Sequence, residues 1–344
     1  MKDIKFNRFK NNSLIILYKL LDFEQDIKHP LSSIKSKKLT KCIQKITLNC
    51  ILPEQVLYTR PDKICCLLKI NSLQIVCGSY NSLISVWDLK MNNYIKSANL
   101  KGHKFCITSF VKISSDEIAS SSRDCSIKIW DLTKQTCKKT LKEHNNDVEC
   151  LILLNPQQLI SGSLDKTIKL WDILQGTCLW TFGNGFAGSA GEVICLLKIN
   201  SNFILSGHAD NKSIKLWDFN NKIFVKVLKG HTGVVRCLTK LDKNKFLSGS
   251  EDNTIKLWNI YKGIRVNTYK GHKYAVLSIV ILTYGRFLSG DTDGLLKIWD
   301  LDKATCLKTM NMGVLNETIS IIKLNLVQVL VSGNVRNEIK LWTI

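Results

Sequence analysis

The sequence predicts an all-β chain in which one β-rich module occurs in seven copies. The first observation is a series of seven tryptophans at intervals of 41 to 46 residues, with Trp180 as the one tryptophan outside it. The second is the segment before most of them: an apolar pair, small residues, an acidic turn and a run such as Ile-Lys-Leu-Trp. A fixed interval of about 40 residues is typical of repeat architectures. The series is Trp87, Trp130, Trp171, Trp217, Trp258, Trp299 and Trp342.

Each copy contains two adjacent strand patterns joined by a short turn. Over residues 159–172 the chain reads Leu-Ile-Ser-Gly-Ser-Leu-Asp-Lys-Thr-Ile-Lys-Leu-Trp-Asp, and residues 246–259 are nearly identical. The alternation of Ile with Lys and Leu with Trp has the period of a strand, and Asp-Lys or Asp-Asn between two such runs is typical of a hairpin. Each copy is therefore expected to be mostly β.

With Gly-His and Trp-Asp landmarks about 40 residues apart, the chain resembles the WD-repeat β-propellers, with blades most similar to those of F-box/WD-type and related adaptor proteins. The resemblance implies seven four-stranded blades, one for each tryptophan of the series, in a closed ring without long exposed sheet edges. We therefore expect a basic N-terminal extension over residues 1–53, partly helical or disordered, and a seven-bladed propeller over residues 54–344.

The ends of the chain predict how the ring closes. Only two residues follow Trp342, so the seventh blade lacks its outer strand. The segment Gln55–Thr59 precedes the first copy at the offset where other copies carry their outer strand, with Leu57 in the place of Leu100. We expect this N-terminal strand to complete the last blade.

Four copies share a fixed spacing of His, Ser, Asp and Trp, in which Ser follows His by 17 residues, Asp follows Ser by four and Trp follows Asp by six. Ser, His and Asp also form hydrolase triads. Because one chain has little use for four nucleophiles, whereas every blade must satisfy the same buried polar groups, a structural role is favoured. The resemblance implies the same role, a buried hydrogen-bonded tetrad. The sets are His103, Ser120, Asp124 and Trp130; His144, Ser161, Asp165 and Trp171; His231, Ser248, Asp252 and Trp258; and His272, Ser289, Asp293 and Trp299.

Other catalytic or metal-binding motifs are not apparent in the sequence. Residues 183–188 match Gly-x-Gly-x-x-Gly, but a strand-like run follows where a dinucleotide loop would open a helix. His29 and His208, outside the four sets, have no partners at metal-ligand spacing. We expect a non-enzyme with no catalytic residue, no cofactor and no metal.

The resemblance also implies which residues line the mouth of the central channel, on the wide face where such propellers usually bind partners. These positions lie three and five residues after the tetrad His and directly before the tetrad Asp. They are Tyr80, Cys106, Thr108, Arg123, Asp147, Glu149, Leu164, Glu192, Ile194, Val234, Arg236, Glu251, Ala275, Leu277 and Thr292. Blade four breaks the repeat with four inserted residues and a glycine-rich loop. The partner-binding candidates are Tyr80, Arg123, Glu149, Leu164, Arg236, Glu251 and Leu277 at the mouth, with Gly185 and Phe186 in that loop.

The composition bears on partners and compartment. The net charge of +21 is compatible with a polyanionic partner, but only seven of the 49 basic residues are Arg, which planar phosphate recognition favours. Thirteen cysteines without a Cys-x-x-Cys pair predict reduced packing thiols, and hence a cytoplasmic or nuclear protein. No apolar run approaches the roughly 20 residues that cross a bilayer.

The expected function is a non-enzymatic interaction scaffold or adaptor, a single propeller within a larger complex, that binds protein or peptide partners, including acidic ones. One alternative is a substrate-recognition subunit of a ubiquitin ligase, although residues 1–53 lack the Leu-Pro helix start typical of an F-box. A second alternative is a basic propeller in an RNA- or ribosome-linked assembly. Nucleic acid is not the favoured partner.

Overall fold

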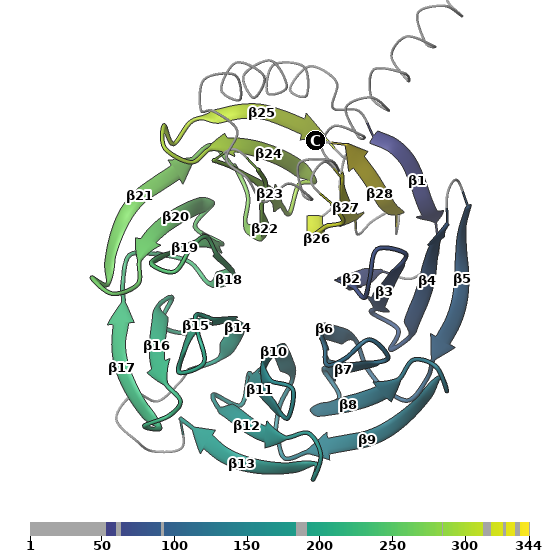
Figure 1. Cartoon of the computed structure of the whole chain (residues 1–344). Helices are drawn as coiled ribbons and strands as arrows, with labels where there is room; N and C mark the ends of the chain where they lie inside the picture. The colour runs from purple at the N-terminus through teal and green to yellow at the C-terminus, as the bar shows by residue number, and fades with distance from the viewer. Residues whose placement is uncertain are drawn as a thin grey trace, which may run out of the picture. The chain divides into compact units, whose positions relative to one another are not determined.

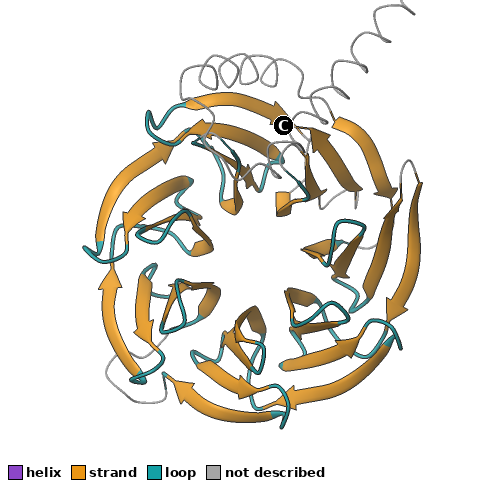
Figure 2. Ribbon diagram, viewed as in Figure 1, coloured by secondary structure: helices purple, strands orange, loops and turns teal. Residues whose placement is uncertain are grey.

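The computed structural model describes residues 53–59, 63–90, 93–183, 191–283, 285–311, 318–325, 328–333 and 338–343. Among these residues the regular structure is entirely β, as predicted (Figure 2). The predicted N-terminal extension lies outside the described residues except for Pro53, which begins the first strand.

The strands form seven antiparallel four-stranded sheets, arranged as the blades of a closed ring (Figure 1). In blades one to six the four strands follow one another in the chain from the centre outward. Blade one contains β2 (Ile64–Lys69), β3 (Gln74–Ser79), β4 (Ile84–Lys90) and β5 (Asn93–Leu100), and blade two contains β6 (Ile107–Lys112), β7 (Glu117–Ser122), β8 (Ser126–Asp131) and β9 (Thr136–Lys142). Blade three contains β10 (Val148–Asn155), β11 (Gln158–Ser163), β12 (Ile168–Asp172) and β13 (Thr177–Phe182), and blade four contains β14 (Val193–Lys198), β15 (Phe203–His208), β16 (Ile214–Asp218) and β17 (Ile223–Leu228). Blade five contains β18 (Val235–Lys240), β19 (Lys245–Ser250), β20 (Thr254–Asn259) and β21 (Ile264–Lys270), and blade six contains β22 (Val276–Ile281), β23 (Arg286–Asp291), β24 (Leu295–Asp300) and β25 (Cys306–Asn311).

Blade seven joins the two ends of the described chain. Its inner strands are β26 (Thr318–Lys323), β27 (Gln328–Gly333) and β28 (Glu338–Thr343), and its outer strand is β1 (Pro53–Thr59). β1 pairs antiparallel with β28, from Pro53 opposite Trp342 to Thr59 opposite Glu338. The prediction that an N-terminal strand closes the last blade is confirmed.

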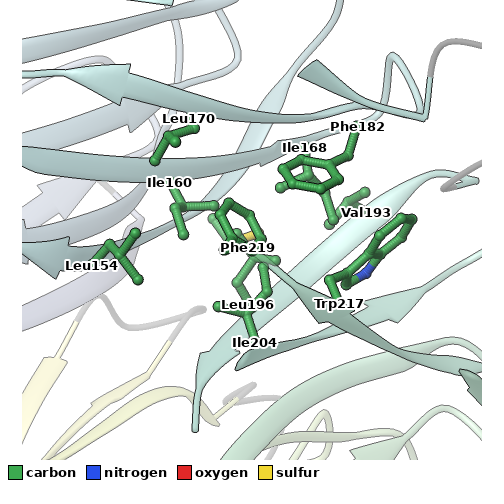
Figure 3. Close-up of a cluster of buried hydrophobic side chains, with 11 residues drawn as sticks. Leu154, Ile160, Ile168, Leu170, Phe182, Val193, Leu196, Ile204, Trp217 and Phe219 are labelled. Atoms are coloured by element: carbon green, nitrogen blue, oxygen red, sulfur yellow. The ribbon is translucent and has the colours of Figure 1, made fainter. Parts of the chain in front are cut away.

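The hydrophobic core is divided among the interfaces between neighbouring blades. Figure 3 shows the cluster between blades three and four, where Ile160, Ile168 and Phe182 of blade three meet Val193 and Trp217 of blade four. The rings of Phe182 and Trp217 meet edge to face, with centroids 5.7 Å apart. Because each sheet is covered on both faces, the second and third strands are almost wholly buried, as in the IKLWD strand of blade four.

The repeated tryptophans take part in these interfaces all round the ring. Each indole belongs to the cluster that its blade shares with the preceding blade, and Trp87 of blade one lies in the cluster shared with blade seven. Burying one aromatic side chain contributes about 2–3 kcal/mol, so a tryptophan every 40-odd residues supplies each interface with a large apolar contribution. Each repeat thus contributes one indole to one interface between blades.

Lysines at the inner-strand ends connect consecutive blades in a second way. The ammonium of Lys112 donates to the carbonyl of Ile70 in blade one at 2.6 Å, and Lys240 donates to Ile199 in blade four at 2.5 Å. Lys198 contacts the carbonyl of Leu154, and Lys69 contacts that of Leu324 across the closure of the ring. Part of the basic excess therefore has a structural role.

Candidate functional site

The repeated His, Ser, Asp and Trp spacing produces a hydrogen-bonded set of four buried side chains in blade two. The indole N–H of Trp130 donates to Ser120 Oγ at 2.7 Å, and Ser120 Oγ lies 2.8 Å from His103 Nε2. On the other side of the imidazole, Nδ1 lies 2.8 Å from Asp124 Oδ2. With the imidazole proton on Nδ1, the indole, hydroxyl and imidazole each donate to the next group. The same arrangement is formed by His144, Ser161, Asp165 and Trp171 in blade three and by His231, Ser248, Asp252 and Trp258 in blade five.

The aspartate of each set also organises the turn in which it lies. Asp124 accepts hydrogen bonds from the amides of Lys104 and Ser126 at 2.9 and 3.0 Å, and from the Ser126 hydroxyl at 2.6 Å. Burial alone would raise its pKa, but the hydrogen bonds from His103, Ser126 and the Lys104 amide outweigh burial and hold the pKa of Asp124 well below its usual range. The carboxylate therefore ties the loop before the innermost strand to the turn between the second and third strands.

The structure corrects the predicted set in blade six. His272 Nε2 lies 2.6 Å from Ser289 Oγ, and Trp299 donates to the same hydroxyl at 2.8 Å. However, His272 Nδ1 contacts Asp291 at 2.7 Å, and Asp293 contributes only its amide, which donates to Asp291 at 3.1 Å. Asp291 lies two residues after Ser289 on the same strand, so alternation places it on the face that carries the serine. The prediction that Asp293 completes this set is wrong.

Blade four contains an imidazole that the spacing rule missed. His208 Nε2 lies 2.7 Å from Ser206 Oγ, which also accepts the indole N–H of Trp217 at 2.7 Å. His208 is fully buried, and no described carboxylate accepts from its Nδ1. The missed signal was again alternation along β15, since residues two apart share a face.

The closure blades are wired differently from the others. In blade one the Ser79 hydroxyl donates to Asn81 Oδ1 at 2.5 Å, with Asn81 at the tetrad Asp position and Cys77 at the Ser position. In blade seven the buried indole N–H of Trp342 finds no acceptor among the described residues.

Burial argues against hydrolytic chemistry at the four serines that the imidazoles contact in blades two, three, five and six. Each of these serines has 0% exposure, and each hydroxyl oxygen already accepts an indole N–H. A nucleophilic hydroxyl must reach a substrate carbonyl. The residue types of a hydrolase triad are therefore present, but a substrate has no access to the serine hydroxyls.

A cavity of about 390 Å³ lies at the mouth of the ring and is a candidate ligand site, here called the mouth cavity. Nine of its lining residues occupy positions that the sequence predicted for the channel mouth. They are Tyr80, Cys106, Thr108, Arg123, Glu149, Ile194, Arg236, Leu277 and Thr292. Lys63 and Cys65 complete the lining and were missed, although the offsets that give Cys106 and Thr108 in blade two give these residues in blade one.

Carboxylates accompany both arginines of the mouth cavity. Arg236 Nε donates to Glu251 Oε1 at 2.8 Å. Arg123 Nε lies 3.6 Å from both Asp147 Oδ2 and Glu149 Oε1. Burial raises the pKa of Glu149 despite the adjacent arginine. The lining is thus mixed in charge, and both guanidinium groups already lie beside a carboxylate.

The remaining candidates fall elsewhere. Leu164 and Glu251 do not line the mouth cavity. Glu251 accepts a hydrogen bond from Arg236, which does line it. Gly185 and Phe186 lie outside the described residues. Within the described ranges, no group of three or more His, Cys, Asp or Glu side chains is placed to hold a metal ion. No helix in the described part of the chain is long and apolar enough to cross a membrane.

A closed ring of seven four-stranded blades, with indole–hydroxyl–imidazole sets beneath its loops, defines the chain as a seven-bladed β-propeller. Five segments, residues 95–131, 135–172, 176–218, 222–259 and 263–300, match the family model of the WD domain, G-beta repeat, and together make up more than half of the chain. The chain belongs to the WD-repeat family. Propellers of this family generally mediate protein–protein interactions and are typically non-enzymatic scaffolds.

Two comparisons with individual proteins agree with this assignment. The chain is 27% identical over 204 residues to the WD repeat-containing protein 55 homolog of Dictyostelium discoideum, a match over 58% of this chain and 38% of that relative. The chain thus spans well under two thirds of the relative's length. The crystal structure of the WD40 β-propeller domain of Doa1 shares the fold, with a TM-score of 0.74 and 23% identity over 86% of this chain and 97% of that chain.

Proposed function

We propose that the chain is a non-enzymatic interaction scaffold or adaptor whose protein or peptide partner docks over the mouth cavity. The observation that carries the proposal is the variety of side chains at one strand position. The equivalent position in six consecutive blades holds Cys65, Thr108, Glu149, Ile194, Arg236 and Leu277, six different residue types that all line the cavity. The buried positions of the same blades carry similar residues from one blade to the next. The repeat is therefore broken at the position that lines the cavity.

The lining suits a peptide segment better than a densely charged ligand. Tyr80 is 58% exposed at the cavity and offers an aromatic contact, the kind of residue enriched at interaction hot spots. Leu277 and Ile194 add apolar surface, while Arg236 and Glu149 add one charge of each sign. Because carboxylates already contact both cavity arginines, a phosphorylated degron of the kind read by ligase receptors is not favoured.

We place the protein in the cytoplasm or the nucleus, where cysteines stay reduced. The ubiquitin-ligase alternative stays a prediction and would require a cullin adaptor to co-purify through residues 1–53. The RNA alternative also stays a prediction, and it requires binding that weakens steeply between about 50 and 200 mM salt.

The test is affinity purification of the full chain and two matched variants. Tyr80 lies in the turn between the second and third strands of blade one, at the mouth end. Tyr261 is also 58% exposed but lies in the turn between the third and fourth strands of blade five, at the opposite end of the blades. We expect Tyr80→Ala to reduce capture of the partner about tenfold, as for loss of one hot-spot side chain, and Tyr261→Ala to leave it unchanged.

Quantitative mass spectrometry of the captured proteins measures both effects. A partner that is retained by Tyr80→Ala and lost by Tyr261→Ala would place the interface on the other face. Capture that disappears with ribonuclease treatment would favour the RNA alternative instead.

A further inference from the structure

Two thiols meet inside the mouth cavity. Cys65 lies on β2 of blade one, and Cys106 lies directly before β6 of blade two. Their sulfur atoms are 3.2 Å apart, and both side chains line the cavity. The two cysteines are 41 residues apart in the chain and occupy different positions of the repeat, so their contact joins two neighbouring blades.

These two thiols differ from four packing cysteines on the innermost strands of the ring. Cys66, Cys150, Cys195 and Cys237 share one repeat position, where each sulfur faces the glycine of the neighbouring strand. Burial raises the pKa of all four, in the case of Cys237 to about 12. Thiols in such surroundings are inert because only the thiolate is a nucleophile.

The surroundings of Cys106 favour its thiolate. A hydrogen bond with Cys65 lowers the pKa of Cys106, and the positive charges of Arg123 and Lys63 act in the same direction, against the opposing effects of burial and Glu149. The same hydrogen bond raises the pKa of Cys65. Cys106 therefore loses its proton more readily and can act as the nucleophile, whereas Cys65 keeps its proton. This arrangement is typical of redox-sensitive cysteine pairs.

We propose that Cys65 and Cys106 form a peroxide-sensitive pair that closes to a disulfide between blade one and blade two at the mouth cavity. The Cys106 thiolate attacks one oxygen of hydrogen peroxide, the O–O bond breaks, and Cys106 becomes a sulfenic acid while hydroxide leaves. The Cys65 sulfur then attacks the Cys106 sulfur, the S–O bond breaks and the hydroxyl group leaves as water with the Cys65 proton. In total, two thiols lose two electrons and two protons, and one peroxide becomes two waters.

The geometry allows this closure with a small movement. A disulfide needs sulfur atoms about 2.05 Å apart, so the pair must approach by about 1 Å. The cavity of about 390 Å³ is far larger than the roughly 30 Å³ of a water molecule and admits a peroxide of similar size. This chemistry requires no partner protein.

The experiment treats the reduced full chain with hydrogen peroxide, blocks remaining thiols and maps disulfides by mass spectrometry of unreduced peptides. We expect a link between Cys65 and Cys106, formed about tenfold faster than oxidation of the exposed Cys137 and Cys306 and reversed by dithiothreitol. Cys65→Ser should abolish the link and leave a sulfenic acid on Cys106 that a dimedone probe traps. Cys66→Ala is the matched control, because Cys66 lies in the same peptide and should leave the link intact.

Two results would overturn the proposal. The first is the absence of a Cys65–Cys106 link at peroxide concentrations that already oxidise Cys137 and Cys306. The second is a link that persists in Cys65→Ser or that peptide fragmentation assigns to Cys66. Fragmentation of the wild-type peptide separates Cys65 from Cys66, so the outcome does not depend on the folding of any variant.

Discussion

Asp165 accepts four hydrogen bonds and so affects more of blade three than its size suggests. It accepts from His144, from the amides of Asn145 and Thr167, and from the Thr167 hydroxyl. Asp165→Ala would remove the carboxylate that His144 Nδ1 and two backbone amides contact, at a cost of about 2–3 kcal/mol. We expect the Tm to fall by roughly 5 °C in calorimetry, with no change in any chemical activity.

Blade six offers a matched pair for the same measurement. Asp291 has 0% exposure and contacts His272, whereas Asp293 is only half-buried and contributes a backbone amide. Asp291→Ala should therefore lower the Tm as Asp165→Ala does, and Asp293→Ala should lower it much less. Equal effects at both positions would contradict the assignment of Asp291 to the hydrogen-bonded set.

His208 predicts a dependence of stability on pH. Burial, aided by the charge of Lys215, lowers the pKa of His208 to about 4, from 6.5 for an ordinary histidine. Between those values the unfolded chain binds a proton that the folded chain does not, so the free energy of unfolding falls as the pH drops from 6.5 towards 4. The loss approaches about 1.4 kcal/mol per pH unit.

Urea unfolding of wild type and His208→Asn at pH 7 and pH 5 measures this contribution, because asparagine does not titrate. The wild type should lose more stability than the variant between the two pH values. His231, whose pKa burial also lowers, titrates in both proteins and cancels in the difference. The tetrad carboxylates with lowered pKa, such as Asp165, lose their contribution only below about pH 4. Identical losses would show that His208 is accessible to protons in the folded state.

Individual residues were the hardest feature to predict from the sequence. The repeat spacing predicted that Asp293 contacts the imidazole in blade six. Asp291, two residues earlier, lies on the same strand face as Ser289 and makes this contact instead. The spacing did not predict the role of His208, because this histidine lies at the end of β15. In blades two, three, five and six the histidine that contacts the serine lies in the loop before the innermost strand. The proximity of Cys65 and Cys106 depends on how adjacent blades pack, which no pattern within one repeat contains.

At the level of elements, the outer strand of blade seven is the segment that closes the ring. Deleting residues 53–59 would remove the partner of β28 and leave the backbone donors and acceptors of that strand exposed at a sheet edge. We expect a lower Tm and a tendency of the shortened chain to associate through this edge. Calorimetry and light scattering measure the two effects, and an unchanged Tm in a monomeric protein would contradict the role of β1.

The strands themselves were predictable because each carries a strong local signal. The Ile-Lys-Leu-Trp run forms the third strand of blades three, four and five, and the Asp-Lys and Asp-Asn pairs lie in the turns before it. Alternation alone would suggest one buried face, but neighbouring blades cover both faces of each sheet. The lysine of this run is consequently buried in all three blades, as Lys169, Lys215 and Lys256 show.

For the whole molecule, the series of seven regularly spaced tryptophans, with the family resemblance, was sufficient to predict the number of blades. Each indole packs against the preceding blade, so seven tryptophans require seven interfaces, and seven interfaces require a closed ring. The surface was less predictable. The net charge of +21 suggested a polyanionic partner, yet four lysines, Lys69, Lys112, Lys198 and Lys240, direct their ammonium groups to carbonyls of the preceding blade.

The pairing of β1 with β28 also determines how the molecule responds to mechanical tension. The first residue of β1 lies opposite the end of β28, so a pull applied at residues 53 and 343 loads one end of this ladder. The hydrogen bonds would then break one after another, as in peeling, rather than all together in shear. We expect optical tweezers to open blade seven at low force, and a high initial rupture force would contradict this geometry. A partner that pulled on both ends could thus open the ring at blade seven without unfolding the other blades.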